Sequence, residues 1–229
     1  MRLMPPLMLL DLDNTLIDRN LGFHGWAVEF LQQRSLPPTE LDWLTTLDCG
    51  GHTDRTTLVH AALERYGLAE DSAVLLKEYQ ETLIRLIDCP AAHQEALRTA
   101  RAAGWTLGIV TNGTADHQLA KIERTGLAGL VDGWVVSEEV GYAKPDPRIF
   151  RIAARRCGLA DASASAWAAD TWMVGDHAPA DIAGARAAGL RSVWLDHGRP
   201  WPETVYAPTL TARSLPEAVR LILDSTDVP

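Results

Sequence analysis

Cysteine is scarce in this chain of 229 residues, which contains only Cys49, Cys89 and Cys157. The three are odd in number and far apart, and they lack the paired spacing of disulfide frameworks and zinc sites. We therefore expect neither a disulfide framework nor a zinc site. Chains of this kind suit a reducing compartment, so a cytoplasmic location is the expectation.

Long apolar runs are also missing. The opening stretch is interrupted by Pro5 and Pro6 and stops at Asp11, which makes it too short for a signal peptide or a membrane span. Positive charge is low as well, because 21 Lys and Arg residues face 30 Asp and Glu residues, for a net charge of -9. Nucleic-acid polymers and anionic membranes bind clusters of Lys and Arg, so we expect neither as a partner. The oligomeric state stays open.

The composition, 47% hydrophobic and 22% charged, is typical of a folded globular protein with a substantial core. The length allows one sizeable domain and a smaller insertion, but not two full domains.

Residues 20–88 have a helical pattern that no strand pattern interrupts. Apolar residues recur three and four positions apart, for example in Trp26–Leu31. Turn residues at Pro37-Pro38 and Gly50-Gly51 divide the region into roughly four helices. The sequence therefore predicts an all-helical insert at residues 19–88.

The pattern changes after Pro90, where short apolar runs alternate with helical segments. This alternation predicts an α/β fold, a doubly wound parallel sheet with helices on both faces, formed by residues 1–18 and 89–229. The first strand ends at Asp11 and belongs to the same sheet, although the insert separates it in sequence. The later strands are predicted at Trp105–Val110, Trp134–Val136, Trp172–Val174 and Ser192–Leu195, and the helices between them at 91–103, 115–124, 147–157 and 178–188.

Polar residues follow the predicted strands at one repeated place. Asp11 and Asp13 come where the first apolar run ends. The carboxyl ends of parallel strands share one edge of a sheet, so polar groups far apart in sequence meet there. The other groups in such positions are Thr15, Thr111-Asn112, Lys144, Asp176 and Asp181.

Carboxylates brought together repel one another unless a cation joins them. Oxygen ligands without nearby cysteine or histidine favour Mg²⁺. A lysine and small hydroxyl or amide donors beside the metal suit a phosphoryl group. In such a site Asp11 can attack phosphorus, and Asp13 can protonate the leaving alcohol and later take a proton from water.

The ordered set of motifs resembles the haloacid dehalogenase superfamily, in its phosphatase branch. Asp11, Asp13 and Thr15 fill the DxDxT motif, Thr111 matches the hydroxyl position, and Lys144 matches the family lysine. The segment that begins at Gly175 supplies the last acidic pair, Asp176 and Asp181. Four motifs in order are specific, whereas one alone would be weak.

The resemblance implies a role for each residue. Asp11 is the nucleophile that forms an aspartyl phosphate, and Asp13 is the acid and base. Thr15 orients Asp13 and is also assigned to the phosphate-binding set. Mg²⁺ is bound by the side chain of Asp11, the backbone carbonyl of Asp13, and Asp176. The remaining roles concern the metal surroundings and the phosphate: Asp181 holds a metal-bound water or Lys144, Thr111 and the Asn112 backbone bind phosphate oxygens, and Lys144 neutralises charge. The helical insert resembles a class I cap.

The expected reaction is Mg²⁺-dependent hydrolysis of a small-molecule phosphate ester. The dehalogenase branch lacks the second aspartate of the first motif, so Asp13 argues against it. A sugar phosphomutase and a catalytically silent protein that binds a phosphorylated ligand stay open. Pyrimidine 5′-nucleotidase-like and phosphoglycolate phosphatase-like specificities also stay open, the first because of a similar stretch around Ile122–Leu127.

Some polar residues have no assigned role. Arg55 and His52 in the insert are as well explained by solvent exposure as by substrate binding. Asp116 and Glu123, in the helix after Thr111, are predicted to form a solvated face.

Overall fold

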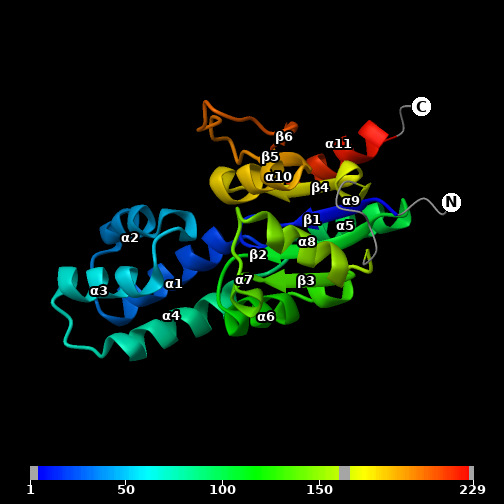
Figure 1. The fold of residues 1–229 in the computed structure, drawn as a ribbon. Helices are drawn as coiled ribbons and strands as arrows, with labels where there is room; N and C mark the ends of the chain where they lie inside the picture. The colour runs from blue at the N-terminus through cyan, green and yellow to red at the C-terminus, as the bar shows by residue number, and fades with distance from the viewer. Residues whose placement is uncertain (1–4, 160–165, 227–229) are drawn as a thin grey trace. The chain divides into compact units, whose positions relative to one another are not determined.

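The computed structural model describes residues 5–159 and 166–226. The chain divides into two compact units, one formed by residues 1–17 and 89–229 and the other by residues 18–88. Figure 1 shows the course of the chain. None of the helices in the described ranges combines the length and the apolar character needed to cross a bilayer.

The larger unit is built on a sheet of six parallel strands in the order β3-β2-β1-β4-β5-β6. The α/β class with a parallel sheet is therefore confirmed. The strands are β1 (Leu7–Leu10), β2 (Thr106–Thr111), β3 (Gly133–Val136), β4 (Thr171–Gly175), β5 (Arg191–Leu195) and β6 (Leu210–Ala212).

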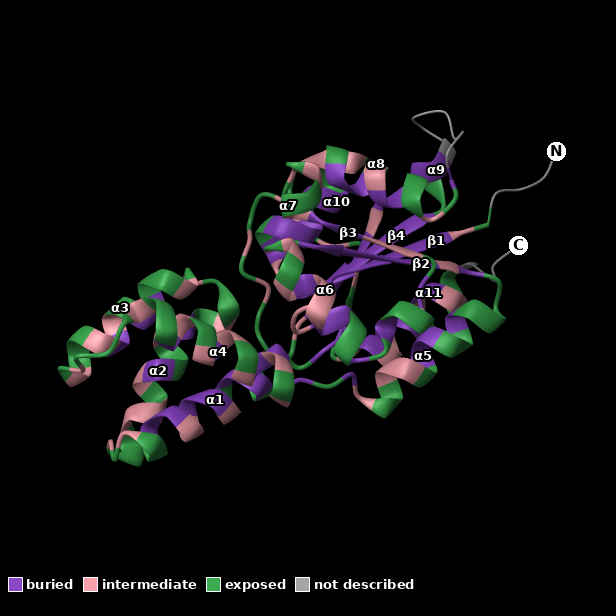
Figure 2. Cartoon of the chain, turned by 90° about the horizontal axis from the view of Figure 1, so that it is seen from below, coloured by how far each residue is buried: buried purple, intermediate pink, exposed green. Residues whose placement is uncertain are grey.

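Helices cover both faces of this sheet. On one face, α8 and α10 pack together, and on the other α5 packs against α11 (Figure 2). The helices and helical turns of this unit are α5 (Ala91–Ala102), α6 (Ala115–Arg124), η3 (Leu127–Gly129), α7 (Ser137–Val140), α8 (Pro147–Arg156), α9 (Ala166–Ala169), η4 (Ala178–Ile182), α10 (Ala183–Ala188) and α11 (Leu215–Thr226).

The strands are buried on both faces, which explains why β1 is apolar throughout. All four of its residues are at most 1% exposed. Leu7 and Leu9 belong to the core cluster that also contains Ile149 and Phe150 of α8. A strand covered on both sides reads as a continuous apolar run rather than an alternation. The position of β1 in the middle of the sheet places its carboxyl end at the centre of the sheet edge.

The order in which strands are added to the sheet reverses at β1. From β1 it builds outward through β2 to β3, and then returns to add β4, β5 and β6 on the other side. In open α/β sheets, ligands bind outside the carboxyl ends of the strands where the order reverses. A ligand-binding site is therefore expected at the residues that follow β1 and β4.

Two parts of this unit were not predicted. Strand β6 has only three residues, too few for a periodic pattern, and α11 follows it. Helix α11 ends at Thr226, where the described residues also end. The predicted helix at 178–188 begins as a π-helical turn, η4, before it becomes α10.

The smaller unit consists of helices, as the sequence predicted. They are α1 (Arg19–Gln33), η1 (Pro38–Glu40), α2 (Leu41–Asp48), η2 (Cys49–Gly51), α3 (Arg55–Tyr66) and α4 (Ser72–Leu86). Asp18, Asp54 and Asp71 cap α1, α3 and α4, because each side chain accepts a hydrogen bond from a backbone N–H of the first turn.

An aromatic core holds α1 and α4 together. Phe23, Trp26 and Phe30 recur on one face of α1, and all are buried. The ring of Trp26 meets Tyr79 of α4 edge to face, with centroids 4.7 Å apart. Such pairs add to the stability from burial alone. That this unit works as a cap stays a prediction.

A buried ion pair lies beside this aromatic core. The guanidinium of Arg19 donates to both carboxylate oxygens of Asp48, with Nη2 2.7 Å from Oδ1, and also to the hydroxyl of Tyr79. Asp48 in turn accepts from the backbone N–H of Gly51 at 3.0 Å, which ties down the turn after α2. Removal of one partner from such a pair leaves an uncompensated charge.

We predict that Asp48→Ala lowers the free energy of unfolding by ~3 to 5 kcal/mol, because it removes the carboxylate that compensates the buried charge of Arg19. The matched control is Glu81→Ala, which breaks the exposed pair with Lys77 at 3.8 Å and should cost at most ~1 kcal/mol. Urea denaturation followed by circular dichroism measures both. Equal losses in the two variants would contradict the prediction.

Candidate active site

Asp11 directly follows β1 at the centre of the sheet edge. Its backbone N–H donates to the carbonyl of Val174 at 2.9 Å, which continues the pairing of β1 with β4 for one more residue. Its side chain is 11% exposed, and its Oδ1 accepts a hydrogen bond from Lys144 Nζ at 2.6 Å. The end of the central strand therefore presents a carboxylate that is almost buried and already paired with a cation.

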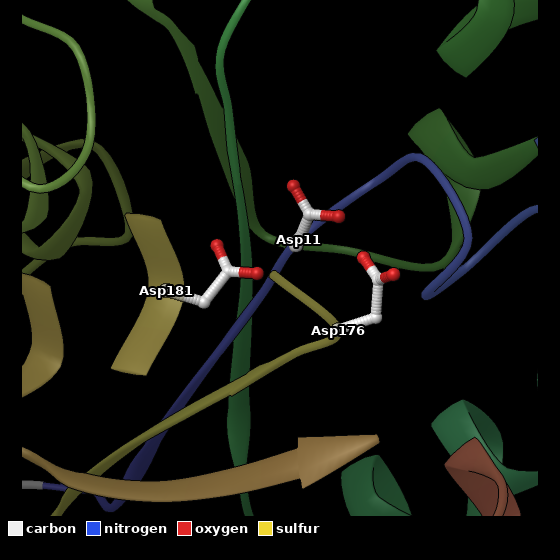
Figure 3. Close-up of side chains that lie close together, drawn as sticks. All are labelled: Asp11, Asp176 and Asp181. Atoms are coloured by element: carbon white, nitrogen blue, oxygen red, sulfur yellow. The ribbon is translucent and has the colours of Figure 1, made fainter. Parts of the chain in front are cut away.

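Asp176 and Asp181 lie beside Asp11. One ligand oxygen from each of the three carboxylates lies within 4.8 Å of the other two. Figure 3 shows the three side chains pointing into a common space, from the ends of β1 and β4 and from η4. Strands β1 and β4 are neighbours, so the convergence of Asp11 and Asp176 follows from the strand order.

Lys144 joins two of these carboxylates. Besides its bond to Asp11, its Nζ lies 2.7 Å from Oδ1 of Asp181. The side chain of Lys144 is 2% exposed, so the ammonium group is taken out of water and placed between two anions. This matches one of the two roles expected for Asp181, that of holding Lys144.

The amide of Asn112 fixes the backbone of Lys144. Its Nδ2 donates to the carbonyl of Lys144 at 2.9 Å, and its Oδ1 accepts from the Lys144 N–H at 2.8 Å. The two bonds together set the direction from which the lysine enters the site. The side chain of Asn112 is thus a support for Lys144, and the phosphate-binding role of its backbone stays a prediction.

Asp181 reaches the site because β4 ends in glycine. A Cβ atom on Gly175 would overlap the carboxylate of Asp181. The same carboxylate accepts a hydrogen bond from the backbone N–H of His177 at 3.0 Å. In the pair Gly175-Asp176, the aspartate therefore supplies one carboxylate and the glycine leaves room for the carboxylate of Asp181.

The segment after β5 supports Asp176, and sequence reasoning missed it. The indole Nε1 of Trp194 donates to the carbonyl of Asp176 at 2.9 Å. Arg199 Nη2 donates to the same carbonyl at 3.0 Å and lies 3.1 Å from Oδ2 of the side chain. Arg199 and Trp194 lie outside the four motifs, and no spacing in the sequence relates them to Asp176.

The electrostatics of the site favour a bound cation. Burial, opposed by Lys144 and reinforced by Asp181, raises the pKa of Asp11 to about 7. Burial and repulsion from Asp11 and Asp181 raise the pKa of Asp176 to about 8. Burial lowers the pKa of Lys144, but its two carboxylate partners outweigh this effect and raise that pKa above its usual value. Lys144 and the partly exposed Arg199 do not fully compensate three acidic groups.

The donor set fits Mg²⁺. Asp11, Asp176 and Asp181 offer carboxylate oxygens, the ligands that hard divalent cations prefer, and the described residues contribute no cysteine or histidine to this group. Asp181 has both oxygens engaged, Oδ1 by Lys144 and Oδ2 by the His177 N–H, whereas Lys144 bonds only Oδ1 of Asp11. The side chains of Asp11 and Asp176 are therefore the better placed ligands.

Asp13, two residues after Asp11, is held by helix α6. Lys121 Nζ lies 2.7 Å from both of its carboxylate oxygens, and Gln118 Nε2 donates to Oδ2 at 3.1 Å. Thr15 was expected to orient Asp13, but this contact is not made: the buried Thr15 hydroxyl has no hydrogen-bond partner among the described residues. The phosphate-binding assignment of Thr15 stays a prediction.

Gln118 and Lys121 were not predicted from the sequence. Asp116 and Glu123 of the same helix are exposed, as predicted. One feature of the sequence could have revealed Lys121. The chain has three lysines among 21 basic residues, and two of them, Lys121 and Lys144, are buried beside carboxylates of the first motif.

Gln118 also connects Asp13 to Thr111. Its Nε2 donates to Thr111 Oγ1 at 2.5 Å. The structure therefore brings the predicted site residues together in two sets, one around Lys144 and one around Gln118. His52 and Arg55 belong to the helical unit and are not placed relative to either set.

A family model for haloacid dehalogenase-like hydrolases matches residues 6–189. The chain belongs to this family. All of the predicted site residues lie within the matched segment. The resemblance inferred from the motifs is thus confirmed.

Relatives within the family include enzymes named for different phosphate esters. The chain is 44% identical to the pyrimidine 5′-nucleotidase YjjG of Escherichia coli over 51% of its length, and 36% identical to a phosphoserine phosphatase of Thermus thermophilus over 71%. These alignments span 49% and 63% of the two relatives, so less than two thirds of either. The crystal structure of the hydrolase YfnB from Bacillus subtilis has the same fold, with a TM-score of 0.79, 24% identity and coverage of 95% of this chain and 98% of YfnB.

We predict that Gly175→Ala lowers the free energy of unfolding by ~1 to 3 kcal/mol, because the added methyl group displaces the buried carboxylate of Asp181. Gly129→Ala is the matched control, since a Cβ at Gly129 would meet no atom within 4 Å. Guanidinium denaturation of both variants measures the difference. The explanation of Gly175 is wrong if the two variants unfold alike.

Proposed function

We propose that this protein is a Mg²⁺-dependent phosphatase that hydrolyses a small phosphomonoester through an aspartyl-phosphate intermediate. The observation that carries the proposal is the pairing of a nearly buried Asp11 carboxylate with Lys144 at the centre of the sheet edge, with a second aspartate, Asp13, two residues further on. Family membership and the names of the relatives support it.

In the first step, a carboxylate oxygen of Asp11 forms a bond to phosphorus, and the bond from phosphorus to the ester oxygen breaks. The leaving alcohol takes the electron pair of that bond and a proton from Asp13. Lys144 fixes Oδ1 of Asp11 at 2.6 Å and keeps the nucleophile in one orientation. Its charge also offsets the negative charge of the incoming phosphate.

In the second step, Asp13 takes a proton from water, the water oxygen bonds to phosphorus, and the bond between phosphorus and Asp11 breaks. Inorganic phosphate leaves and Asp11 is restored. Thr111 Oγ1 and the backbone N–H of Asn112 serve as donors to the phosphoryl oxygens. Asp13 ends this step protonated, ready for the next ester.

The side chains of Asp11 and Asp176 and the backbone carbonyl of Asp13 would hold Mg²⁺, with Asp181 beside them. When bound, the ion supplies positive charge that neutralises the carboxylates and the phosphoryl oxygens. Asp176 is kept in place by Trp194 and Arg199.

The substrate is proposed only as a class, a phosphorylated small molecule. The relatives named nucleotidase and phosphoserine phosphatase differ in the ester that their names give, so a panel must include nucleoside monophosphates, phosphoserine and sugar phosphates. Release of free phosphate supports the proposal, whereas an isomerised sugar phosphate without phosphate release would indicate a mutase.

We predict that Asp11→Asn lowers phosphate release from a generic aryl phosphate in the presence of Mg²⁺ by on the order of 10³-fold or more, because the amide oxygen is a poor nucleophile. Asp116→Asn, at an exposed position of α6, is the matched control and should retain activity. Robust activity of pure Asp11→Asn protein would overturn the proposed mechanism.

The raised pKa values predict that two quantities change in opposite directions as the pH rises: the stability of the metal-free protein and the increase in Tm that Mg²⁺ causes. In the folded protein Asp11 and Asp176 keep protons up to about pH 7 and 8, whereas unfolded aspartates lose them near 3.8. Without metal, stability should therefore fall as the pH rises from about 4 to about 8. Mg²⁺ binds the ionised carboxylates, so the rise in Tm that it causes should grow over the same range.

Thermal unfolding in EDTA and in MgCl₂, across this pH range, measures both trends. Asp176→Asn should flatten the pH dependence of the metal-free protein and reduce the effect of Mg²⁺. An effect of Mg²⁺ on Tm that is constant or shrinks as the pH rises would argue against a metal bound by these carboxylates.

A further inference from the structure

Asp13 is held by two side chains of α6 that no motif includes. Gln118 and Lys121 are three positions apart, so they lie on one face of the helix. Both are at most 1% exposed, which is unusual for a lysine. The ammonium group of Lys121 lies 2.7 Å from each oxygen of the Asp13 carboxylate, whose side chain is 27% exposed.

Gln118 adds a second hydrogen-bond donor to Asp13 and links it to Thr111. Its Nε2 donates to Asp13 Oδ2 at 3.1 Å and to Thr111 Oγ1 at 2.5 Å, so one amide links the ends of β1 and β2. Gly113 makes room for it, because a Cβ at that position would lie 3.1 Å from Gln118 Cγ. The backbone of Gly113, with φ of +144°, also disfavours any other residue there.

Asp13 accepts more hydrogen bonds than are needed to compensate the buried charge of Lys121. A buried lysine needs one anionic partner, whereas here both oxygens are engaged by Nζ and one of them also by an amide. Such a contact opposes rotation of the carboxylate about its bond to Cβ. A proton donor that is held in one orientation loses little entropy when it reaches the transition state.

We propose that Lys121 and Gln118 are positioning residues that fix the carboxyl group of Asp13, which as the carboxylate takes a proton from the attacking water and, once protonated, gives it to the leaving alcohol of the next ester. This inference rests on the proposed function. It assigns to α6 a part in the reaction beyond its packing against the sheet, and it gives the small residue after Thr111-Asn112 a second reason besides its backbone conformation.

The test uses two substrates that differ in their need for a proton. An alkyl phosphate must release an alkoxide unless Asp13 protonates it, whereas a dinitrophenyl phosphate releases a stable anion. The readout is the ratio of kcat/KM for the alkyl ester to kcat/KM for the dinitrophenyl ester. A loss of folded protein changes both values equally and leaves the ratio unchanged.

Lys121→Met should lower this ratio by ~10- to 100-fold, part of the ~10²- to 10⁴-fold that a positioned acid is worth. Gln118→Leu should lower it by a smaller factor, and it serves as the second variant if Lys121→Met does not fold. Lys77→Met, at the exposed third lysine in the helical unit, is the matched control and should leave the ratio unchanged.

Asp13→Asn should lower the ratio most, and adding Lys121→Met to it should cause no further fall, because the group that Lys121 positions is already removed. A wild-type ratio in both the Lys121→Met and the Gln118→Leu variants, with an active wild-type enzyme, would overturn the positioning role and leave the proposed function intact. A wild-type protein that hydrolyses neither ester would overturn both.

Discussion

The buried ammonium group of Lys144 lets two carboxylates, Asp11 and Asp181, lie together in a place with little water. Its Nζ lies 2.6 Å from one and 2.7 Å from the other. Without this charge, desolvation and mutual repulsion would favour protonation or separation of the two acids. Asn112 aims the lysine by bonding both polar groups of its backbone, and Gly175 makes room for Asp181. The position of the proposed nucleophile thus depends on three segments far apart in sequence, which contain Asn112, Lys144 and Gly175.

The charge left after this pairing explains why the site suits a divalent cation. Asp176 is buried, and the basic side chain paired with it is Arg199, which is 46% exposed and therefore well screened by water. Its pKa is raised to about 8, mainly by burial. A cation bound between Asp11 and Asp176 would relieve the repulsion that Lys144 leaves.

Much of this site could be predicted from the sequence, because it depends on the periodic part of the fold. Apolar runs mark the strands, parallel strands end at one edge, and motifs at those ends must converge, as Asp11 and Asp176 do. The supports were not predictable in the same way. A helical pattern shows that α6 has a buried face, but not that Gln118 and Lys121 fill it to reach Asp13. Thr15, two residues after Asp13, was the residue expected to orient it, and its hydroxyl makes no such contact.

The two carboxylates of the first motif are therefore held by different neighbours, Asp11 by Lys144 and Asp13 by Lys121, and the proposed mechanism gives them different roles. The most direct test of this division is to mix the enzyme with a phosphate ester and Mg²⁺, quench with acid during turnover, and map the phosphorylated peptide by mass spectrometry. We expect the phosphoryl group on Asp11 and none on Asp13. Phosphate on Asp13, or turnover with no covalent phosphate on Asp11 at any quench time, would contradict it.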